Sequence, residues 1–123
     1  MVCLDTNIII DYIRGKQNIV EFVNKCIREG SIRTTAITQY ELGLYGDGKP
    51  TPGKELANLM ETYPLSNEAA DRASELFHIL KAKGRLINEL DILIAGIALS
   101  NDDILVTQDR DFLALESDRI LVI

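Results

Sequence analysis

The stretch Met1–Asn7, Met-Val-Cys-Leu-Asp-Thr-Asn, decides how this chain folds. Its apolar run Val2–Leu4 is bounded by polar residues, which is typical of a short buried strand. The run stops at Asp5, and apolar residues then recur at helical spacing over Ile8–Ile13. In an open α/β sheet, the carboxyl ends of parallel strands share the edge where ligands bind. Asp5 is therefore either the cap of the first helix or a functional carboxylate at that edge.

The rest of the chain alternates short β-branched or apolar runs with segments of helical periodicity. This alternation predicts an α/β fold: a single three-layer domain over residues 1–123, with a mostly parallel central sheet flanked by helices. The segment Gly46–Gly53, rich in glycine and proline, predicts an exposed loop. Further strands are expected at 32–37, 62–65, 104–106 and 119–123, and further helices at 19–29, from 38, at 55–61, from 66 to 84 and from 88.

Composition is that of an ordinary globular protein, with 46% hydrophobic and 26% charged residues. The net charge of −6 excludes a general basic field for nucleic acid. It does not exclude a nucleic-acid substrate, because a metal-loaded acidic site offsets charge locally. Cys3 and Cys26 form no disulfide or zinc pattern and are expected to be small buried side chains, which suits a cytoplasmic protein. No leader is expected, and the longest apolar run, Ile92–Leu99, is too short to cross a membrane.

Four carboxylates fall where predicted strands and helices meet. Asp5 follows the first strand, and Glu41 lies in the first turn of the helix after the second strand. Asp91 lies in the first turn of the helix from 88, which is apolar nearly all round and is therefore expected to be buried. Asp109 follows the strand 104–106. In a parallel sheet these side chains project at one edge. Carboxylates held close together stay ionised only when they are compensated, and Mg²⁺ or Mn²⁺ is the cation that oxygen ligands favour. Such ions activate water and stabilise charge on a phosphate, so the pattern favours phosphodiester hydrolysis.

Each carboxylate also has a local explanation. Thr38–Glu41 fits a capping box, Asn88–Asp91 fits a helix cap, and Asp109 fits a turn. Each of these roles is worth only about 1 kcal/mol of stability. The single histidine, His78, lies on the polar face of its helix and is expected to be a solvated side chain.

Four motifs resemble those of PIN-domain ribonucleases in order and spacing: Leu4–Asn7, Glu41–Leu42, Asp91–Ala95 and Thr107–Phe112. The whole chain is similar to VapC-type toxins of toxin–antitoxin pairs. The resemblance implies a PIN-like fold and an endoribonuclease that depends on Mg²⁺ or Mn²⁺, usually a homodimer, silenced by an antitoxin. It implies that Asp5, Glu41, Asp91 and Asp109 are the catalytic metal ligands and that Thr6, Asn7 and Thr107 orient them, with Asp111 as a cap or accessory.

Substrate contacts are less clearly marked in the sequence. The substrate expected is RNA, with tRNA among the classes to test, and the candidates for phosphate contact are Arg14, Lys16, Arg85 and Arg110. No stripe of basic and aromatic residues for base stacking is found. An antitoxin segment is expected to cover the acidic edge, with an arginine or lysine inserted.

Other classes of protein remain as alternatives. A phosphatase with an aspartate nucleophile would need a second aspartate two residues after Asp5, where the chain has Asn7. A receiver domain would need a lysine after the late strand, which is followed instead by Thr107-Gln108-Asp109. A non-catalytic PIN-like module would use the acidic edge to bind a cation structurally or to dock a basic partner. Another Mg²⁺-dependent phosphate-handling α/β domain is the remaining alternative.

Overall fold

A five-stranded sheet with the order β3-β2-β1-β4-β5 lies at the centre of the computed structural model, and every neighbouring pair of strands is parallel. The structure describes all residues, 1–123. The predicted α/β fold is confirmed, and the sheet is parallel throughout. The elements are β1 (Val2–Leu4), α1 (Thr6–Ile13), α2 (Gln17–Glu29), β2 (Ile32–Thr35), α3 (Ala36–Gly43), η1 (Gly46–Gly48), α4 (Pro52–Asn58), β3 (Glu61–Tyr63), α5 (Asn67–Ala82), α6 (Glu89–Ser100), β4 (Ile104–Thr107), η2 (Arg110–Leu115) and β5 (Ile120–Val122), where η marks 3-10 helices.

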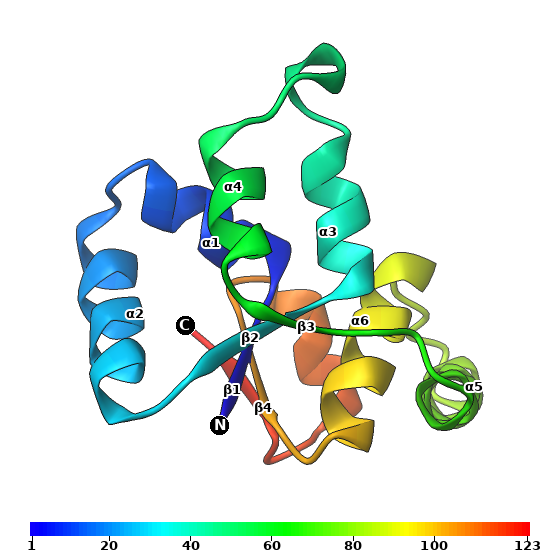
Figure 1. Ribbon diagram of the computed structural model, residues 1–123. Helices are drawn as coiled ribbons and strands as arrows, with labels where there is room; N and C mark the ends of the chain where they lie inside the picture. The colour runs from blue at the N-terminus through cyan, green and yellow to red at the C-terminus, as the bar shows by residue number, and fades with distance from the viewer.

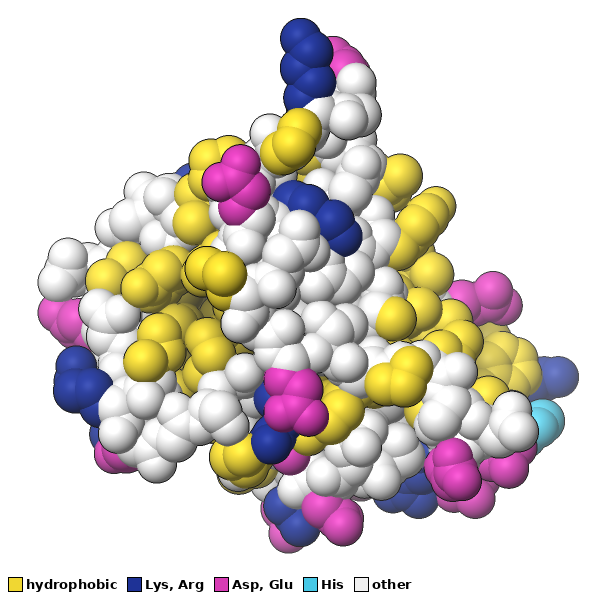
Figure 2. All heavy atoms as spheres, in the orientation of Figure 1, with side chains coloured by type: hydrophobic (Ala, Val, Ile, Leu, Met, Phe, Trp, Pro, Cys, Tyr) yellow, Lys and Arg dark blue, Asp and Glu magenta, His cyan; other side chains and the backbone are white.

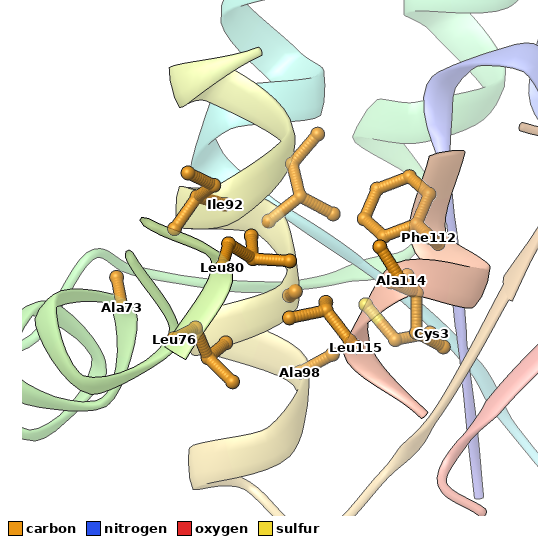
Figure 3. Packing of buried hydrophobic residues seen from close by; sticks show 12 residues of the cluster. Cys3, Ala73, Leu76, Leu80, Ile92, Ala98, Phe112, Ala114 and Leu115 are labelled. Atoms are coloured by element: carbon orange, nitrogen blue, oxygen red, sulfur yellow. The ribbon is translucent and has the colours of Figure 1, made fainter. Parts of the chain in front are cut away.

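Helices cover both faces of this sheet (Figure 1). Successive strand residues point to opposite faces, so Cys3 and Leu105 join the core under α5, α6 and η2, whereas Leu4 and Val106 join the core under α1 and α2. Figure 3 shows the first core, with Cys3 close to Phe112 and Leu115. Cys3 is fully buried as expected, but Cys26 on α2 is only partly buried.

The chain reverses its direction of travel across the sheet at the central strand. From β1 it proceeds outward through β2 to β3, and it returns through α5 and α6 to place β4 on the other side of β1. The carboxyl ends of β1 and β4 therefore meet at the switch point, where the Asp5 amide donates to the Val106 carbonyl oxygen at 2.9 Å. In Figure 1, β1 runs upward from the N-terminus towards this edge.

The second strand is shorter than predicted, since it ends at Thr35 and α3 begins at Ala36. The cause is a cap: the Thr35 hydroxyl oxygen accepts a hydrogen bond from the Thr38 amide at 3.0 Å. The predicted capping box of Thr38 and Glu41 is therefore wrong, and Glu41 lies in the second turn of α3 rather than the first. That change frees the Glu41 side chain from a capping role.

The segment after α3 projects from the body of the molecule (Figures 1 and 2). Its tip, η1, contains Gly46, Asp47 and Gly48 at φ of 75°, 52° and 82°, conformations that favour glycine. The predicted exposed loop is correct up to Thr51, whose hydroxyl caps α4, with Pro52 in the first turn. As a result α4 begins earlier than the predicted 55–61, and β3 spans 61–63 rather than 62–65.

Helix α6 is the buried helix that the sequence predicts, and it packs against α5 at very close range. A Cβ atom on Gly96 would lie 2.8 Å from the Ala69 carbonyl oxygen and 2.9 Å from the Ala73 nitrogen. The predicted cap at Asn88 is confirmed, since its side chain accepts from the Leu90 amide, but Asp91 takes no part in it. Ser66 caps α5 by accepting from the Ala69 amide. His78 is exposed, as expected. None of the helices has the length and apolarity needed to cross a membrane.

The residues after β4 form more than the turn that the sequence predicts around Asp109. Arg110–Leu115 forms the 3-10 helix η2, which buries Phe112 and Leu115 in the core under α6. The sequence signal for it was weak, because three-residue periodicity over so short a run resembles a loop. The last strand, Ile120–Val122, lies within the predicted range.

Candidate active site

The four acidic residues singled out in the sequence line one pocket of about 190 Å³ at the carboxyl edge of the sheet. Each comes from a different segment: Asp5 follows β1, Glu41 lies on α3, Asp91 lies in the first turn of α6, and Asp109 follows β4. The structure therefore brings together side chains that are far apart in the sequence. The remaining lining residues are Thr6, Asn7, Ile10 and Tyr45. Ile10 and Tyr45 were not foreseen, because nothing in their type or spacing marks them.

Asp5 is held by two hydrogen bonds and is only 4% exposed. Its Oδ1 accepts from the Thr6 amide at 2.8 Å, and its Oδ2 accepts from the Thr107 hydroxyl at 2.6 Å. Burial raises the pKa of Asp5 to about 6, although these hydrogen bonds oppose the rise, and the charges of Glu41 and Asp109 add to it. Of the two roles that the sequence offers for Asp5, the structure shows both: it caps α1, and it also places a carboxylate in the pocket.

Glu41 is held by the first residue of α1. The Thr6 hydroxyl lies 2.6 Å from Glu41 Oε1 and 3.1 Å from the Thr38 hydroxyl oxygen. An ionised carboxylate only accepts and a hydroxyl has a single proton, so Thr6 donates to Glu41 and accepts from Thr38. This contact spans α1 and α3, and it fixes one oxygen of Glu41 at the pocket.

Asp91 is the one carboxylate of the four with no hydrogen bond, although it is half-buried. Burial is the largest cause that raises its pKa to about 7, followed by the charges of Asp5, Asp109 and Glu41. The carboxylate of Asp91 is therefore the group in the pocket that takes up a proton most readily near neutral pH.

Asp109 caps η2 as well as lining the pocket. Its Oδ1 accepts from the Asp111 amide at 2.9 Å, and its own amide donates to the Thr107 hydroxyl oxygen at 3.0 Å. The Asp111 side chain does not line the acidic pocket. Its charge nonetheless contributes to the raised pKa of Asp91.

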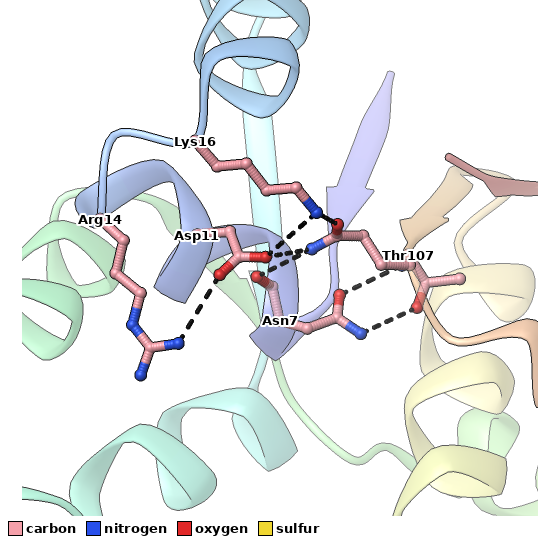
Figure 4. A network of polar contacts seen from close by, with 6 residues as sticks. Asn7, Asp11, Arg14, Lys16 and Thr107 are labelled. Carbon is pink, nitrogen blue, oxygen red and sulfur yellow. Dashed lines mark hydrogen bonds and ion pairs between the residues drawn. The ribbon is translucent and has the colours of Figure 1, made fainter.

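A network of polar contacts supports the pocket from the side of α1 (Figure 4). Asn7 Nδ2 lies 3.5 Å from the Thr107 hydroxyl, and Asn7 Oδ1 accepts from the Gln108 amide at 3.2 Å. Gln108 Nε2 in turn donates to Asp11 Oδ2 at 2.7 Å. Asp11 and Gln108 were missed as site residues; the signal for Asp11 is its place one helical turn after Asn7.

The four basic candidates separate into two pairs. Arg14 and Lys16 each lie 3.8 Å from the Asp11 carboxylate, and Lys16 also donates to Gln108 Oε1 at 2.6 Å (Figure 4). Arg85 and Arg110 line a second hollow that shares no residue with the acidic pocket. The structure therefore places none of the four in the acidic pocket itself.

The chemistry of the pocket fits Mg²⁺ or Mn²⁺. It presents carboxylate, hydroxyl and amide oxygens and contains no histidine or cysteine. Burial and then the neighbouring carboxylates raise the pKa values of Asp5 and Asp91, and no basic side chain lines the pocket to compensate them. No three of these carboxylates lie in an arrangement that could hold one ion directly. Mg²⁺ in proteins usually keeps several water ligands and contacts only one or two carboxylates.

Comparison with known proteins identifies the class to which this fold and pocket belong. The chain matches the PIN domain across residues 2–117, and it is a member of the PIN domain family. It is 31% identical over 121 residues to Ribonuclease VapC5 of Mycobacterium tuberculosis (strain ATCC 25618 / H37Rv), covering 92% of this chain and 86% of that protein. The resemblance of the sequence motifs to PIN-domain proteins of the VapC type is thereby confirmed.

Solved structures lead to the same class. A chain in the crystal structure of VapBC-5 from Mycobacterium tuberculosis, a member of the VapBC family of toxin–antitoxin systems, is 30% identical with a TM-score of 0.66, over 75% of this chain and 80% of that one. A chain in the crystal structure of DNA-bound VapBC from Salmonella typhimurium is 26% identical with a TM-score of 0.78, over 97% of this chain and 95% of that one.

Proposed function

We propose that residues 1–123 act as one nuclease domain, an endoribonuclease dependent on Mg²⁺ or Mn²⁺ that serves as the toxin of a toxin–antitoxin pair. The observation that carries this proposal is the convergence of four carboxylates in one pocket of a PIN domain. Its similarity to a protein named as a ribonuclease, and to chains of VapBC complexes, supports both the reaction and the role.

In this proposal Asp5, Glu41, Asp91 and Asp109 hold the metal ion together with its water ligands, one or two of them by direct contact and the others through water. When bound, the ion would supply an activated water and stabilise the negative charge on the scissile phosphate. The protein's own contribution is orientation. Thr6 and Thr107 fix the two oxygens of Asp5, and Thr6 also fixes Glu41, through hydrogen bonds of 2.6 to 2.8 Å. Asn7 positions Thr107 and the backbone at Gln108.

Asp91 is the least constrained of the four carboxylates in the proposal. Its oxygens make no hydrogen bond within the protein, so they are free to bind the ion. Without an ion, burial and the neighbouring carboxylates raise the pKa of Asp91 to about 7. A cation in the pocket would lower that pKa, because positive charge favours the ionised carboxylate.

We further propose an antitoxin and a second copy of the chain as partners, working in the cytoplasm where RNA is available. Support comes from apolar side chains that lie exposed around the α3–α4 projection (Figure 2). Leu44 and Tyr45, at the end of α3, are 65% and 55% exposed. Apolar side chains grouped at a surface are typical of interaction sites. A basic segment of an antitoxin would complement the acidic pocket nearby.

The second candidate function is a non-catalytic module that docks a basic partner in the acidic pocket. What favours it is that both oxygens of Asp5 already accept hydrogen bonds and that no three of the carboxylates lie where they could hold one ion. A guanidinium or ammonium group would compensate the same negative charge as a cation.

The test is an RNA cleavage assay with purified protein in Mn²⁺ and in EDTA, on tRNA and on an unstructured RNA. The nuclease proposal expects cleavage in Mn²⁺ alone. The variant Asp118→Asn, which removes an exposed charge outside the pocket, is the control and should cleave like wild type. Binding of Mn²⁺ without cleavage of either RNA would support the docking module instead. Addition of the product of the adjoining gene should stop cleavage; unchanged activity would contradict the toxin role.

A further inference from the structure

A second hollow, of about 280 Å³, shares no residue with the acidic pocket. The loop between α5 and α6 forms one wall and η2 forms the other. It is connected to the acidic pocket along the chain, since Arg110, which lines this hollow, directly follows Asp109, which lines the pocket. We call it the arginine hollow. Its lining residues are Arg85, Leu86, Ile87, Arg110, Asp111 and Ala114.

Both arginines of this hollow lack a partner within the protein. Neither guanidinium group is in an ion pair or a hydrogen bond, and both side chains are exposed. The neighbouring Lys83 differs, since it contacts the Ala114 carbonyl oxygen at 3.1 Å and Glu116 at 3.5 Å. Arg14 and Lys16 share Asp11. In a protein with a net charge of −6, two unpaired arginines in one concavity form a local site for an anion.

The residues that line the arginine hollow favour a particular kind of anion. A guanidinium group donates two parallel hydrogen bonds to a phosphate, which makes arginine the side chain best suited to hold one. The Asp111 carboxylate is a pure acceptor and would repel a free phosphate, but it can accept from a hydroxyl or amino group. Leu86, Ile87 and Ala114 offer an apolar surface to a ring. Phosphate, hydroxyl and ring together describe a ribonucleotide.

We propose that the arginine hollow binds one nucleotide of single-stranded RNA next to the phosphate that is cut in the acidic pocket. Arg85 and Arg110 hold its phosphate, and Asp111 accepts from its 2′-hydroxyl. This inference rests on the proposed ribonuclease function. It also makes Arg85 and Arg110 the substrate-binding pair among the four basic candidates, because Arg14 and Lys16 both contact Asp11, whereas Arg85 and Arg110 contact no carboxylate.

The experiment measures binding of a fluorescein-labelled single-stranded oligoribonucleotide by anisotropy, with Ca²⁺ in place of Mn²⁺ and the intact probe checked on a gel. The double variant R85A/R110A should raise Kd about tenfold at low salt, since it removes two phosphate contacts. The slope of log K against log salt should fall by about 1.4, at roughly 0.7 for each contact to a single strand. Both side chains are exposed, so the melting temperature should stay that of wild type.

The matched control is K25A/R28A, which removes the same charge from two exposed, unpaired side chains on α2. It should change Kd by less than about twofold. Asp111→Ala should reduce the preference for RNA over DNA of the same sequence, because only RNA has the 2′-hydroxyl. If R85A/R110A behaves like the control while wild type binds and cleaves RNA, the assignment of the hollow is wrong and the nuclease proposal survives. If wild type neither binds nor cleaves any RNA, both fail.

Discussion

The two sides of the acidic pocket are built by different means. On one side, the junction of β1 and α1 holds Asp5 with two hydrogen bonds, and its support continues through Thr107 to Asn7 and Gln108. On the other side, α6 carries Asp91, which no hydrogen bond holds. The position of Asp91 depends on the packing of α6 against α5, where Gly96 lies in close contact with Ala69 and Ala73. We call these the junction side and the helix side.

The two sides of the pocket therefore contribute differently: hydrogen bonds fix the orientation of Asp5, whereas the charge of Asp91 is free to respond to a ligand. The junction side fixes its carboxylate at a cost, because a buried carboxylate that accepts two hydrogen bonds still has its pKa raised to about 6. The helix side leaves its carboxylate free to respond to whatever enters the pocket. A site for a cation or a proton benefits from both: one ligand that is fixed before binding and one that adapts.

The largest expected effect is on catalysis. Asp5→Asn and Asp91→Asn should each lower Mn²⁺-dependent RNA cleavage by about a thousandfold or more, since each removes a negative charge facing the scissile phosphate site. Cleavage rates under single turnover, with circular dichroism to verify folding, check this. Wild-type activity in either variant would show that the substituted carboxylate is not needed for cleavage. The two variants together therefore test whether both sides of the pocket are needed.

The next effect isolates the packing of the helix side. Gly96→Ala places a methyl group 2.8 Å from the Ala69 carbonyl oxygen and 2.9 Å from the Ala73 nitrogen, both backbone atoms. We expect a loss of about 3 kcal/mol in the free energy of unfolding, because α5 and α6 must move apart. Urea unfolding measures it. Gly43→Ala is the control, since its added Cβ meets nothing within 4 Å and should leave the protein no less stable.

A somewhat smaller effect isolates the hydrogen bonds of the junction side. Thr107→Val keeps the shape of a fully buried side chain but removes the 2.6 Å hydrogen bond to Asp5. We expect a loss of about 2 kcal/mol at pH 8, where Asp5 is ionised, and a smaller loss at pH 5, where it is protonated. Thr107→Ser retains the hydroxyl and should recover most of the stability. Equal losses at both pH values would argue against a role through the Asp5 charge.

The smallest expected effect concerns the pH dependence of stability, which the charge of Asp91 on the helix side should change. The pKa of Asp91 is about 7 in the folded protein, above its ordinary value, so the folded state holds the proton more tightly than the unfolded state. The ionisation of Asp91 therefore lowers the stability of wild type as pH rises from about 4 to 7; Asp91→Asn lacks this loss and keeps only the loss that comes from Asp5. Without metal, we expect the variant to be about 1 kcal/mol more stable at pH 8, since Asp91 is only half-buried and solvent screens part of the effect. The difference should vanish at pH 4.

Added Mn²⁺ provides the counter-test for this prediction. A cation that binds the carboxylate stabilises only the folded wild type. Thermal unfolding in Mn²⁺ should therefore reverse the order of stability. If the order stays unchanged, Asp91 is not among the groups that bind the ion.

Sequence reasoning predicted the succession of helices and strands along the chain and the four acidic residues of the pocket. Each of these residues lies beside a strong local signal. Val2–Leu4 and Ile104–Val106 are apolar runs too short for helices, and Asp5 and Asp109 follow them directly. The apolar surface of α6 likewise marked Asp91 as the start of a buried helix. The parallel sheet then follows from connectivity, since each strand is separated from the next by a helix.

What the sequence missed depends on contacts between distant segments. The β2–α3 boundary was misplaced because Ile37 has high strand propensity, whereas the Thr35 cap starts the helix two residues earlier. Asp11 and Gln108 join the network only because α1 packs beside the end of β4. Likewise, the pairing of Arg85 with Arg110 depends on how η2 folds back beside the α5–α6 loop.

The order of strands also has a consequence for the time at which the pocket exists during protein synthesis. The hydrogen bond between Thr107 and Asp5 joins residues 102 positions apart, and β1 pairs with β4, which is made long after it. A growing chain that has been translated only through α6 contains Asp5, Glu41 and Asp91 but lacks the strand that fixes the first of them. Domains fold as units once their contacts are available. A nascent polypeptide that ends at α6 therefore lacks the complete pocket, and we expect it to gain cleavage activity only after β4 has been made.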